Sequence, residues 1–440
     1  MSLPKYGEYK DSGVAWLGEV PAQWEIAPLK RLFDIVGGST PKSESGEFWG
    51  GDIVWVSPAD LSKLDTLKIV DSARKITNEG LASCGTTLVP PGSLVLSTRA
   101  PIGSLAIADV ELCTNQGCKS LVPKGASKSG FYAYMLLAST EQLNLRGKGT
   151  TFLELSADEL GAFRVVRPEE KEQSAIAAFL DRENRKIDAL IAEQERLLTL
   201  LAEKRQATIS HAVTHGISPS FPMKDSGVPW LGEVAAHWDV RTISSLSTKI
   251  TNGFVGPTRD ILVDEGVRYL QSLHVKRNVI RFDCPYYVRQ DWSEAHAKSI
   301  LETGDVLIVQ TGDIGQAAVV TDEFAGCNCH ALIIVAPVRD AIDGRWLSWV
   351  LNSDYGFHSL LSIQTGALHP HLNCGNVKTL FVPLPPMDEQ LEIVAYIRER
   401  LSTFDELSSE AERAIELLKE RRNALIAAAV TGKIDVRQAA

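Results

Sequence analysis

The sequence lacks the features that mark membrane, secreted and zinc-binding proteins. Its apolar runs, such as LIIVAPV (332–338), are of strand length and fall short of the ~18 residues that a membrane helix needs. The first residues, MSLPKYGEYKDSG, hold no apolar core of a signal peptide, so we expect a cytoplasmic protein. The seven cysteines form no CxxC pair and no Cys/His set with zinc spacing, which predicts reduced thiols and no metal site.

Catalytic motifs and an excess of basic residues are also missing. The chain contains no GxGxxG, Walker A, GxSxG or HExxH motif, and no NPPY-type segment of the kind that holds a flipped adenine in amino-methyltransferases. Its formal net charge is −10, whereas a protein that grips DNA by phosphate neutralisation alone is usually basic. With 440 residues and 44% hydrophobic content, the chain is predicted to form several soluble domains that bind or organise other molecules.

What the sequence does contain is a long internal repeat. Residues 10–26 read KDSGVAWLGEVPAQWEI and residues 224–240 read KDSGVPWLGEVAAHWDV, with twelve of seventeen positions identical. A second match aligns residues 168–217 with residues 385–434, without gaps, and twenty of fifty positions are identical. This period is far too long for a solenoid, so the chain is a duplicated protein with the order block, helix, block, helix. Because the repeated phrase is framework, we expect its tryptophans to be packing anchors: Trp16, Trp24, Trp230 and Trp238.

Each of the two longer aligned segments has the pattern of one long helix. A proline that suits a first helical turn, Pro168 or Pro385, is followed by acidic residues, and the first glycine comes only at Gly216 or Gly432. Apolar residues recur at spacings of three and four, which gives one apolar seam per helix. The predicted seam residues are Leu180, Ile187, Leu190, Leu197 and Leu201 in the first helix and Ile397, Phe404, Leu407, Ile415 and Leu418 in the second.

These seams have two candidate partners. Each helix could pack on its own block, or the two helices could pack on each other as an antiparallel coiled coil. We favour the coiled coil, because ~45 residues span ~68 Å at 1.5 Å per residue, which is longer than a domain of this size is wide.

The two blocks between the helices are predicted to be mixed α/β domains. Short runs rich in β-branched residues, such as IVWVSPADL (53–61), are bounded by Gly, Pro and Asp, with helix-like pieces between them. The blocks align loosely at APIG (100–103) with GDIG (312–315) and at GTTFLEL (149–155) with GALHPHL (366–372). We interpret these phrases as shared frame and expect the divergent residues to distinguish the blocks.

The predicted fold class is therefore α+β. Two similar mixed α/β domains alternate with two long helices that pair as an antiparallel coiled coil, in a pseudo-twofold internal repeat. The predicted boundaries are residues 1–167 and 219–384 for the two blocks, and residues 168–218 and 385–440 for the central and C-terminal helical regions.

Two windows combine basic residues with few acids. Residues 268–289 hold five basic residues, three tyrosines and one acid, and residues 119–148 hold five basic residues and one acid. Such windows suit DNA, but they are also typical of ordinary solvated faces.

The sequence resembles the specificity subunit of type I restriction-modification systems over essentially its whole length. In the first half the resemblance is carried by the first copy of the repeated phrase, by GGSTPKSESGEFWGGDIVWV (37–56) and by TNQGCKSLVP (114–123). In the second half it is carried by the second copy, by FVPLPPMDEQLEIV (381–394) and by RRNALIAAAVTGKIDVR (421–437). One departure lies in the second block, where TNGFVGPTRD (251–260) replaces the GGSTPKS-type phrase.

The resemblance implies a function. In that family the blocks are target recognition domains that each read one half of a split DNA sequence, and the helices set the spacer between the halves. The expected partners are double-stranded DNA, two modification (methyltransferase) subunits carrying S-adenosylmethionine, and restriction (translocase/nuclease) subunits using ATP and Mg²⁺. No catalytic residue, cofactor or metal is expected on this chain. DNA contacts are expected among Arg74, Lys75, Arg99, Lys119, Lys148, Arg268, Arg277, Arg281 and Arg289.

Two other functions stand as alternatives to DNA specificity. The chain could be a coiled-coil scaffold that binds proteins only, or an enzyme, such as a nuclease, with an unrecognised site built from scattered carboxylates.

Overall fold

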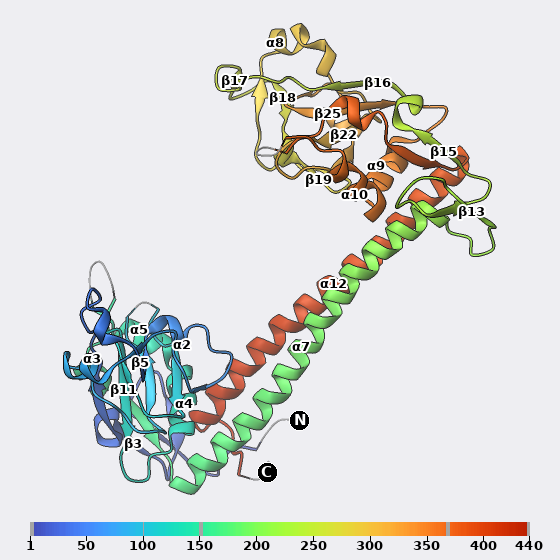
Figure 1. The fold of residues 1–440 in the computed structure, drawn as a ribbon. Coiled ribbons are helices and arrows are strands. Elements are labelled where there is room, and N and C mark those ends of the chain that lie inside the picture. The colour runs from blue at the N-terminus through green and yellow to red at the C-terminus, as the bar shows by residue number, and fades with distance from the viewer. Residues whose placement is uncertain (1–3, 100, 149–152, 367–369, 438–440) are drawn as a thin grey trace. The chain divides into compact units, whose positions relative to one another are not determined.

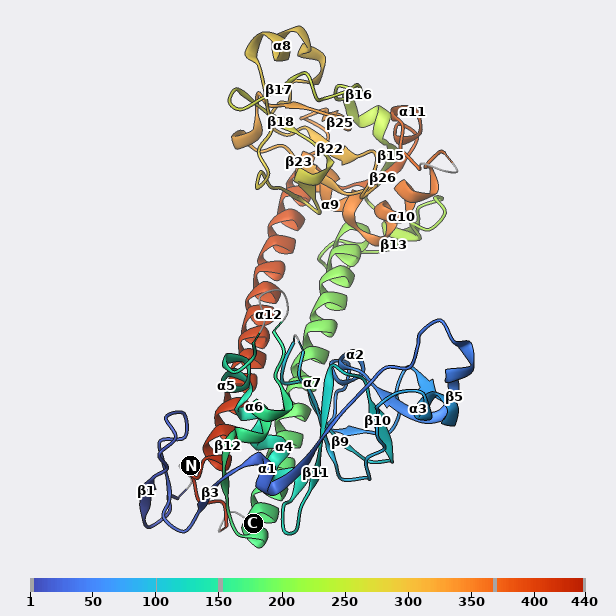
Figure 2. The same cartoon turned by 90° about the vertical axis from the view of Figure 1, so that its left-hand side faces the viewer.

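The chain divides into two compact units, each with one block and part of each long helix. The first unit comprises residues 1–194 and 413–440, and the second comprises residues 195–412. Hydrophobic cores join each block to helix residues of both segments, so the units do not follow the predicted boundaries between blocks and helices. The fold is drawn in Figure 1 and, turned by 90°, in Figure 2. The computed structural model describes residues 4–99, 101–148, 153–366 and 370–437.

The first block is built on a five-stranded sheet. The strands lie in the order β4 (Phe33–Gly37), β11 (Cys118–Pro123), β8 (Leu94–Ser97), β9 (Leu105–Ala108) and β6 (Lys68–Ile69). Strand β11 pairs antiparallel with both β4 and β8, and every side chain of β8 is buried, as expected for a strand in the middle of a sheet. A second sheet has the order β10 (Leu112–Thr114), β5 (Trp49–Val56) and β7 (Lys75–Ile76), with β10 and β5 parallel.

The second block repeats this order of strands. Its main sheet has the order β16 (Ser247–Asn252), β25 (Leu332–Pro337), β22 (Val306–Val309) and β23 (Ala317–Val319). Its other four-stranded sheet contains the parallel pair β18 (Val267–Leu270) and β24 (Asn328–Cys329), which matches β5 with β10. The internal repeat therefore includes the topology of the sheets, which confirms the predicted α+β class.

Each block is closed by a pair of adjacent strands at its entrance and exit. In the first unit, β3 (Glu25–Pro28) pairs antiparallel with β12 (Arg164–Arg167). In the second, β15 (Asp239–Thr242) pairs in the same way with β26 (Phe381–Leu384). The chain thus enters and leaves each block at one place.

The repeated phrase forms a hairpin followed by a fully buried tryptophan. Strand β1 (Tyr9–Asp11) pairs with β2 (Glu19–Pro21), and β13 (Met223–Asp225) pairs with β14 (Glu233–Ala235). After each hairpin, Trp24 or Trp238 packs beside a glycine that follows a long helix, Gly432 or Gly216, and both glycines have positive φ. A Cβ on Gly432 would lie 2.3 Å from Pro21 Cδ, so this position requires glycine.

The two remaining tryptophans of the repeated phrase, also expected to be packing anchors, differ in burial. Trp16 is half-buried and stacks on Phe163, with ring centroids 5.5 Å apart. The prediction was wrong for Trp230, which is 73% exposed at a φ of +67°. The position that matches Phe163 in the repeat is Leu380, which offers no ring for stacking.

This difference between tryptophans of one phrase gives a stability prediction. We expect Trp238→Ala to lower the free energy of unfolding of the second unit by about 3–5 kcal/mol, because it opens a cavity in the core. Trp230→Ala, on the surface of the same loop, should change it by no more than about 0.5 kcal/mol. Urea denaturation followed by circular dichroism measures both, and equal effects would contradict the packing role of Trp238.

The two long helices begin at matching anchors. The first, α7 (Glu170–His215), and the second, α12 (Met387–Val430), each carry a buried glutamine in the first turn. Gln173 Nε2 donates to Pro168 O (2.8 Å), and its Oε1 accepts from Lys128 N (2.9 Å). Gln390 makes the equivalent bonds, to Pro385 O (2.9 Å) and from Asp343 N (2.9 Å). The glutamines fix the start of each helix to the preceding block.

The helices pair antiparallel, as predicted. Within the first unit, Arg422 near the end of α12 forms an ion pair with Asp188 near the start of α7. Within the second unit, Arg205 near the end of α7 pairs with Asp405 of α12. Each arginine and each aspartate recurs at the same place in the repeat, so the two ion pairs are equivalent.

The seam between the helices follows a strict alternation of four and three residues. The prediction was wrong for Leu190, Leu197 and Leu407, which are 51%, 39% and 41% exposed. Each stands one residue before a seam position, and one residue turns the side chain by ~100°. The other predicted residues are buried or half-buried: Leu180, Ile187, Leu201, Ile397 and Ile415 are buried, and Phe404 and Leu418 are half-buried.

Candidate nucleic-acid interface

Each block carries the same small hairpin between its last short helices. In the first block, Lys148 and Glu154 exchange two backbone hydrogen bonds of 3.0 Å each. In the second, Thr365 and His371 exchange two of 2.9 Å. These residues occupy matching positions of the repeat, and residues 149–152 and 367–369 lie outside the described residues.

The hairpin is tied to a tight turn after the central strand of the sheet. Leu155 N donates to Thr98 O (2.8 Å), and Leu372 N donates to Gln310 O (3.0 Å), which is the same bond in both blocks. The turns that follow contain Gly103 and Gly315, both with positive φ, and a Cβ on Gly103 would lie 2.5 Å from Thr140 Cγ2. The described residues of the phrases that we interpreted as frame therefore form a hydrogen-bonded loop pair in each block.

The loop pair of the first block is basic. Arg99 Nε lies 3.2 Å from Glu154 Oε2, and Lys148 Nζ lies 2.7 Å from Glu159 Oε1, with Arg146 also near Glu159 at 3.7 Å. The hydrogen bond from Lys148 holds the pKa of Glu159 below its ordinary value. Exposed ion pairs of this kind stabilise by only about 0–1 kcal/mol, so the three cations can exchange a carboxylate for a phosphate at small cost.

The loop pair of the second block borders a hollow of about 630 Å³. Arg277 lies over the ring of Phe357, with 5.3 Å from its guanidinium carbon to the ring centroid. Gln316 and Gln364 add amide groups to the lining. An amide and a guanidinium are the side-chain groups that pair with base edges in the DNA major groove, so the hollow has the chemistry for reading bases.

Of the nine predicted contacts, the structure brings Arg99 and Lys148 together, because the backbones of both pair with Glu154. It places Arg277 beside the loop pair of the second block. Three others of the first block lie elsewhere. Arg74 stacks over Trp49 at 3.5 Å, next to Lys75, which pairs with Asp71. Lys119 is half-buried on β11.

The remaining candidates of the second block are spread over separate elements. Arg268 on β18 pairs with Glu323 at 3.2 Å, and Arg289 pairs with Asp291 at 3.1 Å before helix α8 (Gln290–Ala295). Arg281 is exposed after strand β20 (Val279–Ile280). Arg268 pairs across strands with Tyr287, and its guanidinium lies 5.4 Å from the ring centroid of Phe282, so parts of this basic window meet in the fold.

Sequence reasoning missed four residues of this interface: Arg146, Gln316, Phe357 and Gln364. The signal that could have found them is the alignment of APIG with GDIG and of GTTFLEL with GALHPHL. These pairs mark the loops that meet, and Arg146, Gln316 and Gln364 stand within three residues of an aligned phrase, whereas Phe357 does not.

Known proteins similar to this chain point to one family. Residues 21–199 match the family described as type I restriction modification DNA specificity domain. The MjaIX specificity subunit of Methanocaldococcus jannaschii is 23% identical over 98% of this chain and 97% of its own length. The EcoBI specificity subunit of Escherichia coli is 21% identical over 92% of this chain and 80% of its own length.

Over most of its length the chain is similar to specificity subunits of type I restriction enzymes. Solved structures of this family share its fold. The HsdS subunit of Thermoanaerobacter tengcongensis superposes with a TM-score of 0.58 over 97% of this chain and 99% of its own, at 17% identity. A chain from a structure of an assembling type I R-M system gives a TM-score of 0.65 over 93% of this chain and 98% of its own, at 18% identity.

Membrane-spanning helices and metal-binding clusters are the remaining features to consider. Within the described ranges, no helix is both long and apolar enough to cross a membrane. Among the same residues, no group of three or more His, Cys, Asp or Glu side chains is placed to hold a metal ion.

Proposed function

We propose that this specificity subunit binds DNA in a sequence-specific way, with each block reading one half of a split target. The observation that carries the proposal is the equivalent loop pair, which has one backbone design and two sets of side chains. A duplex presents the same phosphate backbone at both half-sites but different base edges. A repeated frame with unlike residues, basic in the first block and rich in amides in the second, suits such a target.

We propose further that the chain works in a complex and contributes no catalytic group of its own. Two modification subunits would supply S-adenosylmethionine and the methyltransferase site, and restriction subunits would supply the ATP- and Mg²⁺-dependent steps. A net charge of −10 fits this arrangement, because partner subunits can provide much of the phosphate neutralisation that DNA binding needs. The docking of partners is supported by an apolar face on α7, where Leu197 and Leu200 are exposed around a shallow hollow of about 490 Å³.

A scaffold that binds only proteins is the weaker alternative. It would need the paired helices, but it would not need an equivalent loop pair with divergent polar side chains in each block.

The test is to find the sequence that the complex methylates. The chain is expressed with its modification subunits in a host without adenine methylation, and the genome is sequenced for methylated adenines. We expect one split motif with a fixed spacer. Methylation at unrelated sequences, or none in an assembled complex, would contradict DNA specificity.

Replacing Arg277 tests the interface itself. If Arg277 reads a base, Arg277→Ala should cost about 1–3 kcal/mol of binding free energy and relax one position of one half-site. Arg339→Ala removes an exposed arginine of the same block that pairs with Glu302, and it serves as the control. A uniform weakening at all sequences would instead mean that Arg277 contacts phosphate.

A further inference from the structure

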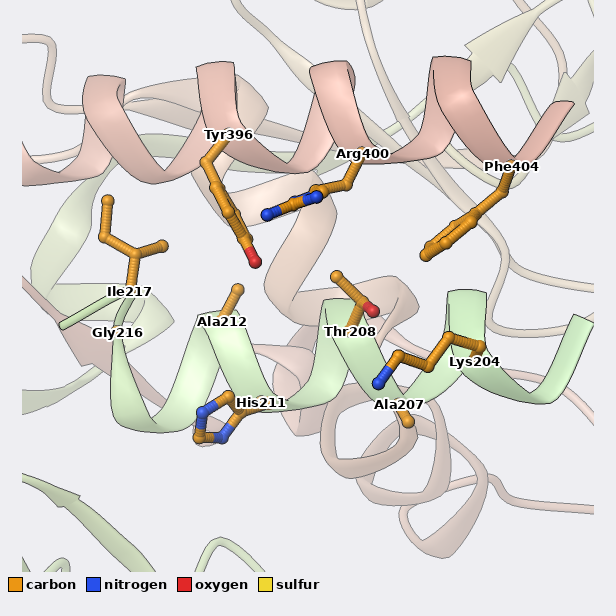
Figure 3. Close-up of a pocket in the computed structure, with 10 residues that line it drawn as sticks. All are labelled: Lys204, Ala207, Thr208, His211, Ala212, Gly216, Ile217, Tyr396, Arg400 and Phe404. Atoms are coloured by element: carbon orange, nitrogen blue, oxygen red, sulfur yellow. The ribbon is translucent and has the colours of Figure 1, made fainter. Parts of the chain in front are cut away.

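A groove between the paired helices of the second unit is unlike the seam around it. It encloses about 560 Å³ where the end of α7 lies beside the start of α12. Figure 3 shows Tyr396, Arg400 and Phe404 reaching from α12 toward α7, where the facing side chains, Thr208 and Ala212, are small. The small residues leave room that larger seam residues would fill.

The groove is positively charged. Lys204 and Arg400 line it together with His211, and no acidic residue is among the described residues of its lining. The guanidinium of Arg400 lies over the ring of Tyr396, 5.4 Å from its centroid. A carboxylate beside Gly216 at the end of the groove, Glu389, already accepts a hydrogen bond from Trp238 Nε1 (3.1 Å) and pairs with His237 Nε2 (2.8 Å). Lys204 and Arg400 are both exposed, so they can bind an outside anion.

The corresponding place in the first unit has a different chemistry. The position that matches Arg400 is Glu183, which already pairs with Lys186 at 2.8 Å. The position that matches Thr208 is Leu425, which packs against the core of that unit, and Tyr396 is matched by the buried Phe179. A larger side chain thus occupies the space, and the charge at the matching position is reversed.

We infer that the groove receives an acidic segment of one modification subunit, so that two copies of that subunit dock on this chain unequally. The inference rests on the proposed function, because it takes the modification subunits as the partners. Aromatic residues and arginine are the types enriched where protein interfaces are buried, and an acidic segment complements the two cations. A partner related by the internal repeat would meet Glu183 and Leu425 instead, and would bind without this contact.

The experiment counts the two binding events separately. Purified modification subunit is titrated into the purified chain and followed by native mass spectrometry and calorimetry. We expect the wild type to take up two copies, with one event weakened by added salt more than the other. Arg400→Glu should weaken that event at least tenfold and leave the other unchanged.

Two matched variants control for charge and for position. Arg398→Glu makes the same charge change on an exposed residue of α12 outside the groove. Arg421→Glu makes it in the first unit, at the position of the repeat that matches Lys204. Neither should change either event, and thermal unfolding checks that all three variants are folded. Arg400→Gln, which removes the charge without reversing it, should weaken the same event less.

The outcomes separate the inference from the proposed function. If Arg400→Glu weakens both events equally, or neither, or no more than Arg398→Glu does, the groove does not hold one subunit. If it lowers DNA binding by the complex while both events stay unchanged, the groove serves a phosphate and the inference is wrong. If the wild-type chain binds no modification subunit at all, the proposed function fails first.

Discussion

Lengthening both long helices by seven residues is expected to lengthen the spacer between the two half-sites by one to three base pairs. A heptad keeps the four-and-three alternation of the seam, so the helices can still pair. The added length is ~10 Å at 1.5 Å per residue, and ~34–36 Å of duplex holds one turn of ~10.5 base pairs. The upper value applies if the helices run parallel to the DNA, and an inclined pair gives a smaller change.

The structure indicates where the insertions belong. Leu201 in α7 and Leu418 in α12 occupy matching seam positions, and each is followed four residues later by the arginine of an interhelical ion pair, Arg205 or Arg422. Insertions after both leucines leave the ion pairs and the packed helix ends unchanged. The spacer is measured by sequencing methylated adenines in a host that carries the variant and its partner subunits.

Two control insertions test whether the helix length sets the spacer or whether the chain merely tolerates added residues. Two residues inserted at the same places would turn the seam by ~200° and should abolish assembly. A heptad in α7 alone would leave seven residues unmatched and should also impair assembly. An active double-heptad variant with an unchanged spacer would show that the helices do not set the distance.

The sequence predicted the fold well because the repeat carried most of the information. Identity at positions such as Gln173 and Gln390, or Asp188 and Asp405, reflects bonds that the structure makes twice. The error at Leu190 has a physical cause: Leu190 and Ile191 are both apolar, and spacing alone does not say which one faces the partner helix. Tertiary packing decides that choice.

The candidate interface was less predictable than the fold. The charge of a sequence window does not show in which direction its side chains point. Arg268 and Arg289 share one basic window, but they lie on different elements. Arg99 and Lys148 are 49 positions apart, and they meet because a hairpin and a turn converge on Glu154. Such convergence is a property of long-range topology, which a single sequence reveals only where its own repeat marks the loops.

Exchanging the first block for that of a relative is expected to replace one half-site and to leave the other half-site and the spacer unchanged. Strands β3 and β12 pair at the entrance and exit of the block, so an exchange of residues 29–163 leaves this strand pair native. The donor should keep the contacts to α7, where Tyr134 Oη donates to Asp181 Oδ1 (2.6 Å) and Lys128 pairs with Glu170. The reciprocal exchange of residues 243–380, between β15 and β26, should replace the other half-site. Methylation sequencing reads both motifs, and a variant in which both half-sites change, or neither does, would mean that the two blocks do not read DNA independently.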